Sequence, residues 1–395
     1  MQNNKSSSTR QKSQHTNPFS AKFAQMFFLL SACLIVGFGG GWVGSKRQTE
    51  QSANESAAQD IIVNESQAIT TIAKNVGPSV VSIAVTNQTT RTDFFGFRSP
   101  VQQQGAGTGV IISEDGLILT NRHVVGSKDA VIVVTLSDGT KLEDVELIGL
   151  SDEGDPLDVA FLKIKYAKGQ KLVPAKLGDS SRVQVGEKVV AIGNALGQFQ
   201  NSVTAGIISG YGRSVIAGDE VSQESLQNLF QTDAAINQGN SGGPLVNASS
   251  EVIGINTAVA GGGAENIGFA IPINDIKGLV QSVLKNGKFE RPYLGVRYVS
   301  LTNDYAYEYN LPVKRGAYLA PVENGSPILP DSPASKAELQ EKDIIIKIDG
   351  TAIDEKNSLT SLIGSKSVGD IVELTILRDN KEQTIKATLE AIPQQ

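Results

Sequence analysis

Residues 239–245 read Gly-Asn-Ser-Gly-Gly-Pro-Leu, a turn of mostly small residues that carries one hydroxyl, Ser241. A serine hydroxyl becomes a nucleophile at neutral pH when an imidazole takes its proton and a carboxylate orients that imidazole. The chain has two histidines, and one of them, His15, lies in a polar N-terminal tail. The other, His123, follows a strand-like run and is the candidate base in the folded part of the chain.

The third member of the candidate site is Asp158, in Leu-Asp-Val-Ala at residues 157–160. Along the chain the order is His123, Asp158 and Ser241. The α/β-hydrolases have the order Ser, Asp, His, and the subtilisins have Asp, His, Ser. The order and spacing found here match the double-barrel serine proteases, in which the aspartate orients the histidine and stabilises its charged form. We therefore predict that these three residues form a catalytic triad.

The glycines around the candidate nucleophile predict an oxyanion hole formed by Gly239, Asn240 and Ser241. The backbone N–H groups of Gly239 and Ser241 can converge on the negative oxygen of a tetrahedral intermediate. Glycine lets the chain adopt the required turn without steric strain at Cβ. Gly242 and Gly243 would let a substrate backbone approach closely.

Short β-strand patterns, separated by turn signals, extend from residue 80 to about residue 272. Val-Val-Ser-Ile-Ala-Val at residues 80–85 is typical of them, and Asp-Gly turns occur at residues 115–116 and 138–139. No long helical pattern interrupts this region, so two small β-barrels are favoured over a parallel α/β sheet. Residues 89–104 show no clean periodicity, and we expect a long loop there.

Helical patterns lie on either side of the β-rich region. One begins at Asn64 and ends at Gly-Pro, residues 77–78. The other begins at Asn274 and ends at Asn-Gly, residues 286–287. After it, the chain mixes short strands with a helix near residues 358–363, which predicts a small α+β domain.

A membrane segment is predicted near the N-terminus. Residues 23–44 carry no charged side chain and lie between Lys22 and Lys46. A helix of this length would extend roughly 33 Å, enough to cross a bilayer. The preceding tail is basic and has no acidic residue, so the positive-inside rule places the N-terminus in the cytoplasm and the rest of the chain outside. Two alternatives stay open, a cleaved signal peptide and a lipoprotein acylated at Cys33.

The composition restricts the possible functions. Apolar residues make up 40% and charged residues 19% of the chain, as in ordinary core-forming proteins. A net charge of −6 gives no reason to expect nucleic-acid binding. The single cysteine rules out an intrachain disulfide. We predict neither a cofactor nor a metal.

From about residue 64 onward, the chain resembles the HtrA family of serine proteases, the DegP and DegS group. The matching segments are Gly-Thr-Gly-Val-Ile-Ile (107–112), Thr-Asn-Arg-His-Val-Val (120–125), Asp-Val-Ala-Phe-Leu-Lys-Ile (158–164), Gly-Ile-Ile-Ser (206–209), Gln-Thr-Asp-Ala-Ala-Ile-Asn (231–237) and Ile-Gly-Phe-Ala-Ile-Pro (267–272). The resemblance implies a chymotrypsin-like double β-barrel, ATP-independent endoproteolysis, and homotrimers built through the protease domains. The family usually has proline where this chain has Ala195 and Gln238, in loops that set activation, so the enzyme could be active or latent at rest.

The residue six positions before the candidate nucleophile is Ala235, where trypsin-like enzymes specific for Lys or Arg carry an acid at the floor of the S1 pocket. Asp233 lies two residues away, too far in sequence to take over that role. An apolar pocket leaves a buried cation without a partner, which costs several kcal/mol. We therefore predict cleavage after small aliphatic residues such as Val, Ala or Ile.

The C-terminal domain resembles the PDZ domains of the same family. Tyr293, Leu294, Gly295 and Val296 match the loop whose backbone N–H groups receive the terminal carboxylate of a peptide, while the peptide adds as a strand to a sheet edge. The family commonly has Gly at the position of Glu338, where we expect a change that faces solvent.

The predicted fold is mainly β, with a double β-barrel protease domain, a small α+β PDZ domain and an N-terminal transmembrane helix. The predicted parts are a cytoplasmic tail (1–22), a transmembrane anchor (23–44), a flexible linker (45–63), a trypsin-like serine protease domain (64–286) and a PDZ domain (287–395). The leading hypothesis is a membrane-tethered endoprotease that acts outside the cytoplasm on misfolded or regulatory proteins. The alternatives are a protease-silent chaperone or scaffold, and a peptide-gated sensor protease with one membrane substrate.

Overall fold

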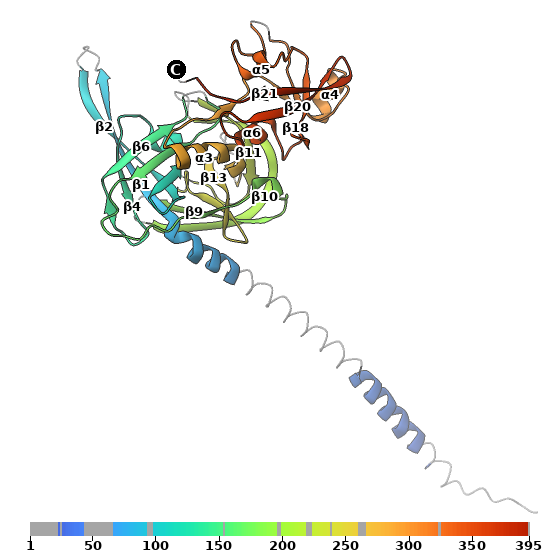
Figure 1. Cartoon of the computed structure of the whole chain (residues 1–395). Coiled ribbons are helices and arrows are strands. Elements are labelled where there is room, and N and C mark those ends of the chain that lie inside the picture. The colour runs from blue at the N-terminus through green and yellow to red at the C-terminus, as the bar shows by residue number, and fades with distance from the viewer. Residues whose placement is uncertain are drawn as a thin grey trace, which may run out of the picture. The chain divides into compact units, whose positions relative to one another are not determined.

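We describe the protein from a computed structural model (Figure 1). The structure describes residues 23, 26–42, 66–92, 98–152, 155–195, 199–218, 223–237, 239–259, 266–322 and 325–393. The chain divides into two units, Met1–Gln67 and Ala68–Gln395, which we describe separately. The predicted cytoplasmic tail (1–22) and flexible linker (45–63) lie outside the described residues.

The described part of the first unit includes a helix over residues 26–42, on which Cys33 is exposed. Within the residues that the structure describes, no helix is both long enough and apolar enough to cross a membrane. The transmembrane helix predicted for residues 23–44 is therefore not supported by the structure.

The second unit begins with a seven-stranded antiparallel sheet. Residues 66–76 are helical and lead through a short 3-10 helix, η1 (Gly77–Ser79), into the first strand. In spatial order the strands are β5 (Lys141–Leu142), β4 (Val131–Thr135), β1 (Val80–Thr92), β2 (Arg98–Ile111), β3 (Leu117–Thr120), β7 (Ala160–Ile164) and β6 (Val145–Leu150). Val81, Ile83 and Val85 alternate along β1 and are buried in the apolar core of this sheet.

Strands β1 and β2 form a long hairpin where the sequence predicts a loop. They remain paired as far as Thr92 and Arg98, so the prediction of a loop over residues 89–104 is wrong. The distal part of the hairpin projects from the body of the unit (Figure 1). An alternating pattern of hydrophobic residues predicts a strand only where one face of that strand packs on a core. A hairpin that projects from the body of the protein lacks this pattern, so it is not predicted from the sequence.

A second sheet, antiparallel except for the parallel pair of β13 and β8, closes into a barrel. Its strands, in spatial order, are β12 (Pro244–Asn247), β9 (Lys188–Ala195), β10 (Phe199–Gly218), β11 (Gln223–Thr232), β14 (Gly268–Pro272), β13 (Glu251–Val259) and β8 (Lys176–Leu177). The barrel closes because β12 pairs with β9 on one side and with β13 on the other. The short 3-10 helix η2 (Ser180–Arg182) precedes β9. The two predicted β-rich halves are thus present, and Ala195, one of the departures from the family pattern, is the last residue of β9.

A helical segment connects this barrel to the C-terminal domain. It begins as a 3-10 helix, η3 (Ile273–Ile276), and continues as α3 (Lys277–Asn286). Gly287 ends α3 in the left-handed conformation, with φ of 65°. The helix predicted from Asn274 onward is therefore confirmed, with a 3-10 first turn.

The C-terminal domain combines a small sheet with three short helices. The strands are β16 (Val299–Ser300), β17 (Ala317–Tyr318), β18 (Ile344–Ile348), β20 (Ile371–Arg378) and β21 (Lys381–Thr388) in spatial order, with β19 (Thr351–Ala352) on β18 and a separate pair, β15 (Pro292–Tyr293) and β22 (Glu390–Ala391). The helices are α4 (Asn303–Glu308), α5 (Pro333–Lys336) and α6 (Leu359–Gly364). Each of α4, α5 and α6 is capped by a Ser or Thr hydroxyl, which accepts a backbone N–H of the first turn. This arrangement confirms the predicted α+β domain.

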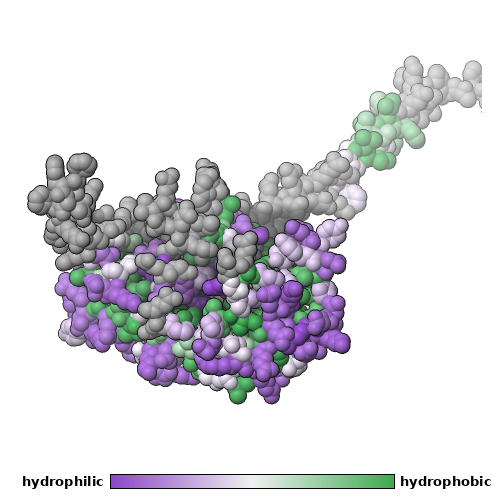
Figure 2. Space-filling model, turned by 90° about the horizontal axis from the view of Figure 1, so that it is seen from above, coloured by the Kyte–Doolittle hydropathy of each residue, from purple (hydrophilic) through white to green (hydrophobic). Residues whose placement is uncertain are grey.

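The face of the second unit seen in Figure 2 is mainly polar. On this face, hydrophilic side chains predominate and hydrophobic ones are scattered among them. The buried apolar residues of the unit form several clusters. One combines residues of both β-rich halves and of α3, and others lie within one half or inside the C-terminal domain. The fold therefore rests on ordinary hydrophobic cores.

Candidate active site

Three separate elements bring the predicted triad together. His123 lies on a short helix, α2 (Arg122–Val125), directly after β3. Asp158 precedes β7, which pairs with β3, so the histidine and the aspartate meet at the same end of two neighbouring strands. Ser241 lies in the turn before β12 of the second barrel. The site is thus assembled between the two β-rich halves, and each half contributes residues that the other lacks.

The aspartate and the histidine are in direct contact. Nδ1 of His123 lies 2.6 Å from Oδ2 of Asp158, and the backbone N–H of His123 donates to Oδ1 at 3.0 Å. Asp158 is fully buried, whereas 37% of the His123 side chain is exposed. Burial raises the pKa of Asp158, but hydrogen bonds from His123 and Thr257 outweigh it, so the pKa lies below the usual range. The carboxylate is therefore charged at neutral pH and can stabilise an imidazolium.

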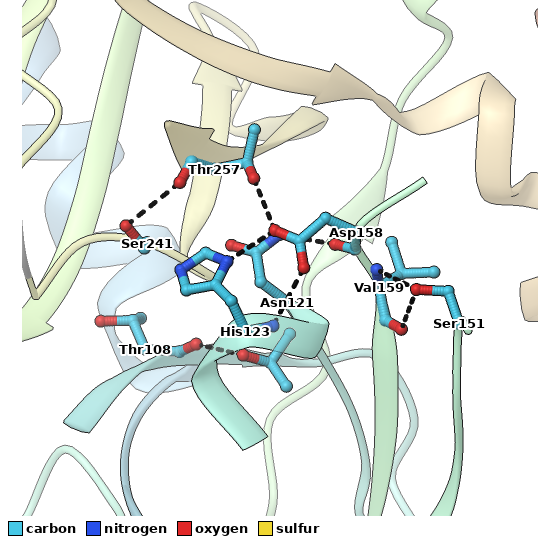
Figure 3. A network of polar contacts seen from close by, with 9 residues as sticks. Thr108, Asn121, His123, Ser151, Asp158, Val159, Ser241 and Thr257 are labelled. Atoms are coloured by element: carbon cyan, nitrogen blue, oxygen red, sulfur yellow. Dashed lines mark hydrogen bonds and ion pairs between the residues drawn. The ribbon is translucent and has the colours of Figure 1, made fainter. Parts of the chain in front are cut away.

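Thr257 connects the aspartate to the serine. Its hydroxyl donates to Oδ2 of Asp158 at 2.7 Å, and its carbonyl oxygen accepts the hydroxyl of Ser241 at 3.4 Å (Figure 3). Sequence reasoning missed this residue. The available signal was a pair of polar residues, Asn256 and Thr257, in strand β13, which is otherwise apolar after its first residue, Glu251; both are buried.

The turn that carries Ser241 (residues 239–243), called the nucleophile turn below, is bound to the first β-rich half, the sheet of strands β1–β7. Thr108, on β2, makes this contact. The Thr108 hydroxyl donates to the carbonyl oxygen of Gly239 at 2.5 Å, and its backbone N–H donates to the carbonyl oxygen of Ser241 at 2.9 Å. Gly242 has φ of 82°, and a Cβ there would lie 2.1 Å from the Thr108 carbonyl oxygen. Only glycine fits this position.

The predicted oxyanion residues lie together in this turn. Gly239 has φ of 114°, and the Asn240 backbone N–H donates to the carbonyl oxygen of Asn237 at 3.1 Å. In the described part of the chain, the backbone N–H of Ser241 has no hydrogen-bond partner. It is thus available to a developing oxyanion. Gln238, the second departure from the family pattern, lies outside the described residues.

The candidate S1 residue, Ala235, is exposed close to the nucleophile turn. Its carbonyl oxygen accepts the side-chain amide of Asn240 and the hydroxyl of Thr204, both at 2.9 Å. The neighbouring carboxylate of Asp233 accepts the backbone N–H of Ile207 at 2.7 Å. Asp233 is thus engaged with strand β10.

The predicted carboxylate-binding loop of the C-terminal domain has a distinctive backbone. Its carbonyl groups at Leu294 and Gly295 accept from Ala334 and Leu329 at 2.8 and 2.9 Å. Among the described residues, the N–H groups of Leu294, Gly295 and Val296 have no hydrogen-bond partner. Gly295 has φ of 83°, and a Cβ there would lie 2.2 Å from Cβ of Ser332. A groove of about 500 Å³ runs along this loop, Tyr293 included, and along α6.

Elsewhere on this domain, Glu338 has φ of 57°, a left-handed conformation that favours glycine, and its side chain is exposed as predicted. Across the residues that the structure describes, no cluster of three or more His, Cys, Asp or Glu side chains could hold a metal ion.

Comparison with known proteins matches each of the two domains to a protein family. Residues 107–255 match the trypsin-like peptidase domain, and residues 292–389 match the PDZ domain. The chain is 40% identical over 301 residues to a probable periplasmic serine endoprotease, DegP-like, of Brucella suis biovar 1 (strain 1330), covering 75% of this chain and 54% of that protein. It is 37% identical over 332 residues to the periplasmic pH-dependent serine endoprotease DegQ of Escherichia coli (strain K12), covering 80% of this chain and 69% of DegQ.

The chain thus spans about half the length of the Brucella relatives that it matches. Among solved structures, it is similar to the HtrA-type protease AlgW with decapeptide, with a TM-score of 0.56 and 30% sequence identity. That similarity covers 83% of this chain and 99% of the AlgW chain.

Proposed function

The chain belongs to the HtrA family of trypsin-like serine proteases, and on this premise we propose that it is an ATP-independent serine endoprotease. Its catalytic triad would be His123, Asp158 and Ser241. The observation that carries the proposal is the 2.6 Å contact between Nδ1 of His123 and Oδ2 of Asp158, with Ser241 linked to the same carboxylate through Thr257.

The reaction follows from the chemistry of these groups. Nε2 of His123 takes the proton of the Ser241 hydroxyl as Oγ attacks the carbonyl carbon of the substrate. Asp158 stabilises the imidazolium and keeps the proton of Nδ1 in place. The backbone N–H groups of Gly239 and Ser241 stabilise the oxyanion. His123 then protonates the leaving amine, and water hydrolyses the acyl-enzyme in the same way.

Substrate selection would depend on the S1 pocket. An alanine at position 235 offers no charge to a Lys or Arg side chain, and the nearby Asp233 is bound to the backbone of Ile207. Burying a cation without a partner is costly. We therefore propose cleavage after small aliphatic residues.

The C-terminal domain would bind the C-termini of proteins. A peptide carboxylate would accept from the N–H groups of Leu294, Gly295 and Val296, and the rest of the peptide would lie in the groove beside α6. A bound peptide would either deliver a substrate or activate the enzyme. The solved AlgW structure with a decapeptide is a precedent for peptide binding in a similar chain.

The location of the enzyme is part of the same proposal. The names of DegQ and of the DegP-like relatives describe periplasmic enzymes, so we propose action outside the cytoplasm. Attachment to the membrane through residues 23–44 rests on the sequence alone, because of its uncharged composition and the basic tail before it. Assembly into a homotrimer likewise rests on the family resemblance. Membrane fractionation and analytical ultracentrifugation of the full chain test these two points.

Peptide hydrolysis tests the enzymatic function. The purified full chain is given a fluorogenic peptide with Val before the scissile bond, with and without a second peptide that ends in a free aliphatic carboxylate. We expect hydrolysis by the wild type and none by Ser241→Ala. Activity only in the presence of the second peptide would favour the peptide-gated sensor. Absence of hydrolysis under both conditions would overturn the proposal in favour of the silent scaffold.

A further inference from the structure

Asn256 is a fully buried polar residue beneath the nucleophile turn, on strand β13. Its backbone is bonded to the turn twice, because its N–H donates to the carbonyl oxygen of Gly243 at 2.9 Å and its carbonyl oxygen accepts the Gly242 N–H at 2.8 Å. Its side-chain amide, Nδ2, donates to two further carbonyl oxygens, those of Asn240 at 3.4 Å and, directly after the turn, Pro244 at 3.2 Å. The side chain therefore spans the turn beneath Ser241.

The first of these side-chain contacts determines how a specific peptide bond is oriented. The carbonyl group of Asn240 and the N–H group of Ser241 belong to one peptide unit. That unit is planar and trans, so its carbonyl and its N–H point in opposite directions. A donor that holds the Asn240 carbonyl oxygen beneath the turn thus directs the Ser241 N–H away from it. The same oxygen also accepts the backbone N–H of Gly243 at 3.0 Å.

The neighbouring peptide units of the turn are held by other groups. Thr108 binds the carbonyl oxygens of Gly239 and Ser241, and the Asn240 N–H donates to the Asn237 carbonyl oxygen. In the part of the chain that the structure describes, the Ser241 N–H is left without a partner. The Asn240–Ser241 unit is thus fixed on its carbonyl side and open on its N–H side, as an oxyanion donor must be.

The side chain at position 256 must be a hydrogen-bond donor, because the two groups that it contacts, the carbonyl oxygens of Asn240 and Pro244, are both acceptors. Oδ1 of Asn256 has no partner among the described residues, so the orientation of the amide is determined by the two carbonyl oxygens. The reversed orientation would direct Oδ1 at both of these oxygens and be repulsive. A carboxylate would be repulsive in either orientation. An apolar side chain of similar volume would fill the space and provide no donor.

We infer that Asn256 is a positioning residue for the oxyanion hole, which keeps the Ser241 N–H directed at the substrate by binding the Asn240 carbonyl oxygen from beneath. This role rests on the proposed protease function. Contacts of 3.2 and 3.4 Å are at or beyond the long end of the N–H···O range. The expected effect of losing them is therefore on the direction of one N–H and less on the stability of the fold.

The test compares three variants of the full chain with the wild type. Asn256→Leu removes both donors while preserving the side-chain volume. Asn256→Asp presents a carboxyl group that can donate a proton only when it is protonated. Asn247→Leu is the matched control, because Asn247 lies at the far end of the same β12–β13 hairpin. There its side chain bonds to Ser249 and Glu251 at 3.0 to 3.2 Å.

The kinetic readout separates positioning from folding. We expect Asn256→Leu to lower kcat by about 10- to 100-fold with little change in KM, less than the ~10²–10³-fold loss on removal of an oxyanion donor. The affinity of a peptide aldehyde, whose adduct with Ser241 places an oxyanion in the hole, should fall in parallel, whereas that of a product peptide should not. Asn247→Leu should retain the wild-type kcat at a comparable melting temperature.

The pH profile provides a second readout. In Asn256→Asp, the protonated carboxyl can still donate to a carbonyl oxygen, and the ionised form cannot. The ratio of variant to wild-type kcat should therefore fall as the pH rises. A wild-type kcat in Asn256→Leu, or aldehyde and product affinities that fall equally, would overturn the inference and leave the protease function standing. A wild type without hydrolytic activity would instead remove the proposed function itself.

Discussion

The hydroxyl of Thr257 donates a 2.7 Å hydrogen bond to Oδ2 of Asp158, the same carboxylate oxygen that contacts Nδ1 of His123. One oxygen thus receives two donors, which keeps the carboxylate ionised although it is fully buried. The carbonyl group of Thr257 also binds the Ser241 hydroxyl, so one residue of β13 is linked to both ends of the triad. Strand β13 therefore acts as the frame on which the reacting groups are aligned.

The Thr257 contact can be removed without a change of shape. Thr257→Val has nearly the same volume but leaves Asp158 with one donor fewer. A hydrogen bond to a charged group contributes ~1.5–3 kcal/mol, so we expect kcat/KM for peptide hydrolysis to fall by about tenfold or more. Thr257→Ser retains the hydroxyl and should remain near the wild type. Equal activity of the Val and Ser variants would show that the hydroxyl does not contribute to the reaction.

Substrate preference should respond to a charge at position 235. Ala235→Asp places a carboxylate where it can pair with a Lys or Arg side chain in the S1 pocket, so cleavage after these residues should increase relative to cleavage after Val. Ala235→Asn has a similar size without the charge and should not show this change. Profiling with a peptide library measures both variants. Dominant cleavage after Arg or Lys by the wild type itself would contradict the predicted apolar pocket.

Peptide binding by the C-terminal domain should depend on Gly295. A side chain there needs a left-handed backbone and collides with Ser332, because the added Cβ would lie 2.2 Å from the Ser332 Cβ. We expect Gly295→Ala to weaken binding of a peptide with a free C-terminal carboxylate by at least about tenfold, as measured by fluorescence anisotropy. Gly350→Ala is the matched control, since Gly350 has φ of 78° but open space around its Cβ position.

If the two glycine variants bind the peptide equally well, the loop at residues 293–296 is not the carboxylate site. A peptide with an amidated C-terminus provides an independent check, because it retains the side chains and lacks the carboxylate. It should bind weakly to the wild type.

Stability should depend on pH through Asp275, which lies on η3 and accepts hydrogen bonds from Asn228 of the protease domain and Ser361 of α6. Burial raises its pKa from the ordinary value of 3.8 to about 7, although both hydrogen bonds oppose the shift. Between these values the folded chain holds a proton that the unfolded chain releases. The contribution of Asp275 to the free energy of unfolding is thus largest below pH 3.8. It falls as the pH rises toward the folded-state pKa of about 7 and is constant above that pKa.

Asp275→Asn removes this titration and preserves the shape of the side chain. The melting temperature of the wild type should decrease relative to that of the variant between about pH 4 and about pH 7. Thermal denaturation followed by circular dichroism measures the difference. A constant difference across this range would mean that Asp275 has the same pKa in the folded and unfolded chains.

Much of this protein could be predicted from local patterns. The order of His123, Asp158 and Ser241 selected one class of protease, and strand and helix periodicities located the two β-rich halves and the helix after Asn274. These features depend on neighbours in the sequence, since periodicity reports which face of an element is buried. The same logic failed for the β1–β2 hairpin, where no face on a core imposes a pattern, and the membrane helix predicted for residues 23–44 received no support from the structure.

Tertiary structure alone decided which distant residues meet. Thr257 contacts Asp158 across 99 positions, and Ser361 contacts Asp275 across 86. Asn256 lies beneath the nucleophile turn because β12 and β13 pair antiparallel, with Pro244 opposite Ile255, and the chain reverses between them. A buried polar side chain needs a hydrogen-bond partner, and the sequence alone does not show which residue provides it. The amino-acid sequence therefore determined the reacting groups, and strand register determined the residues that align them.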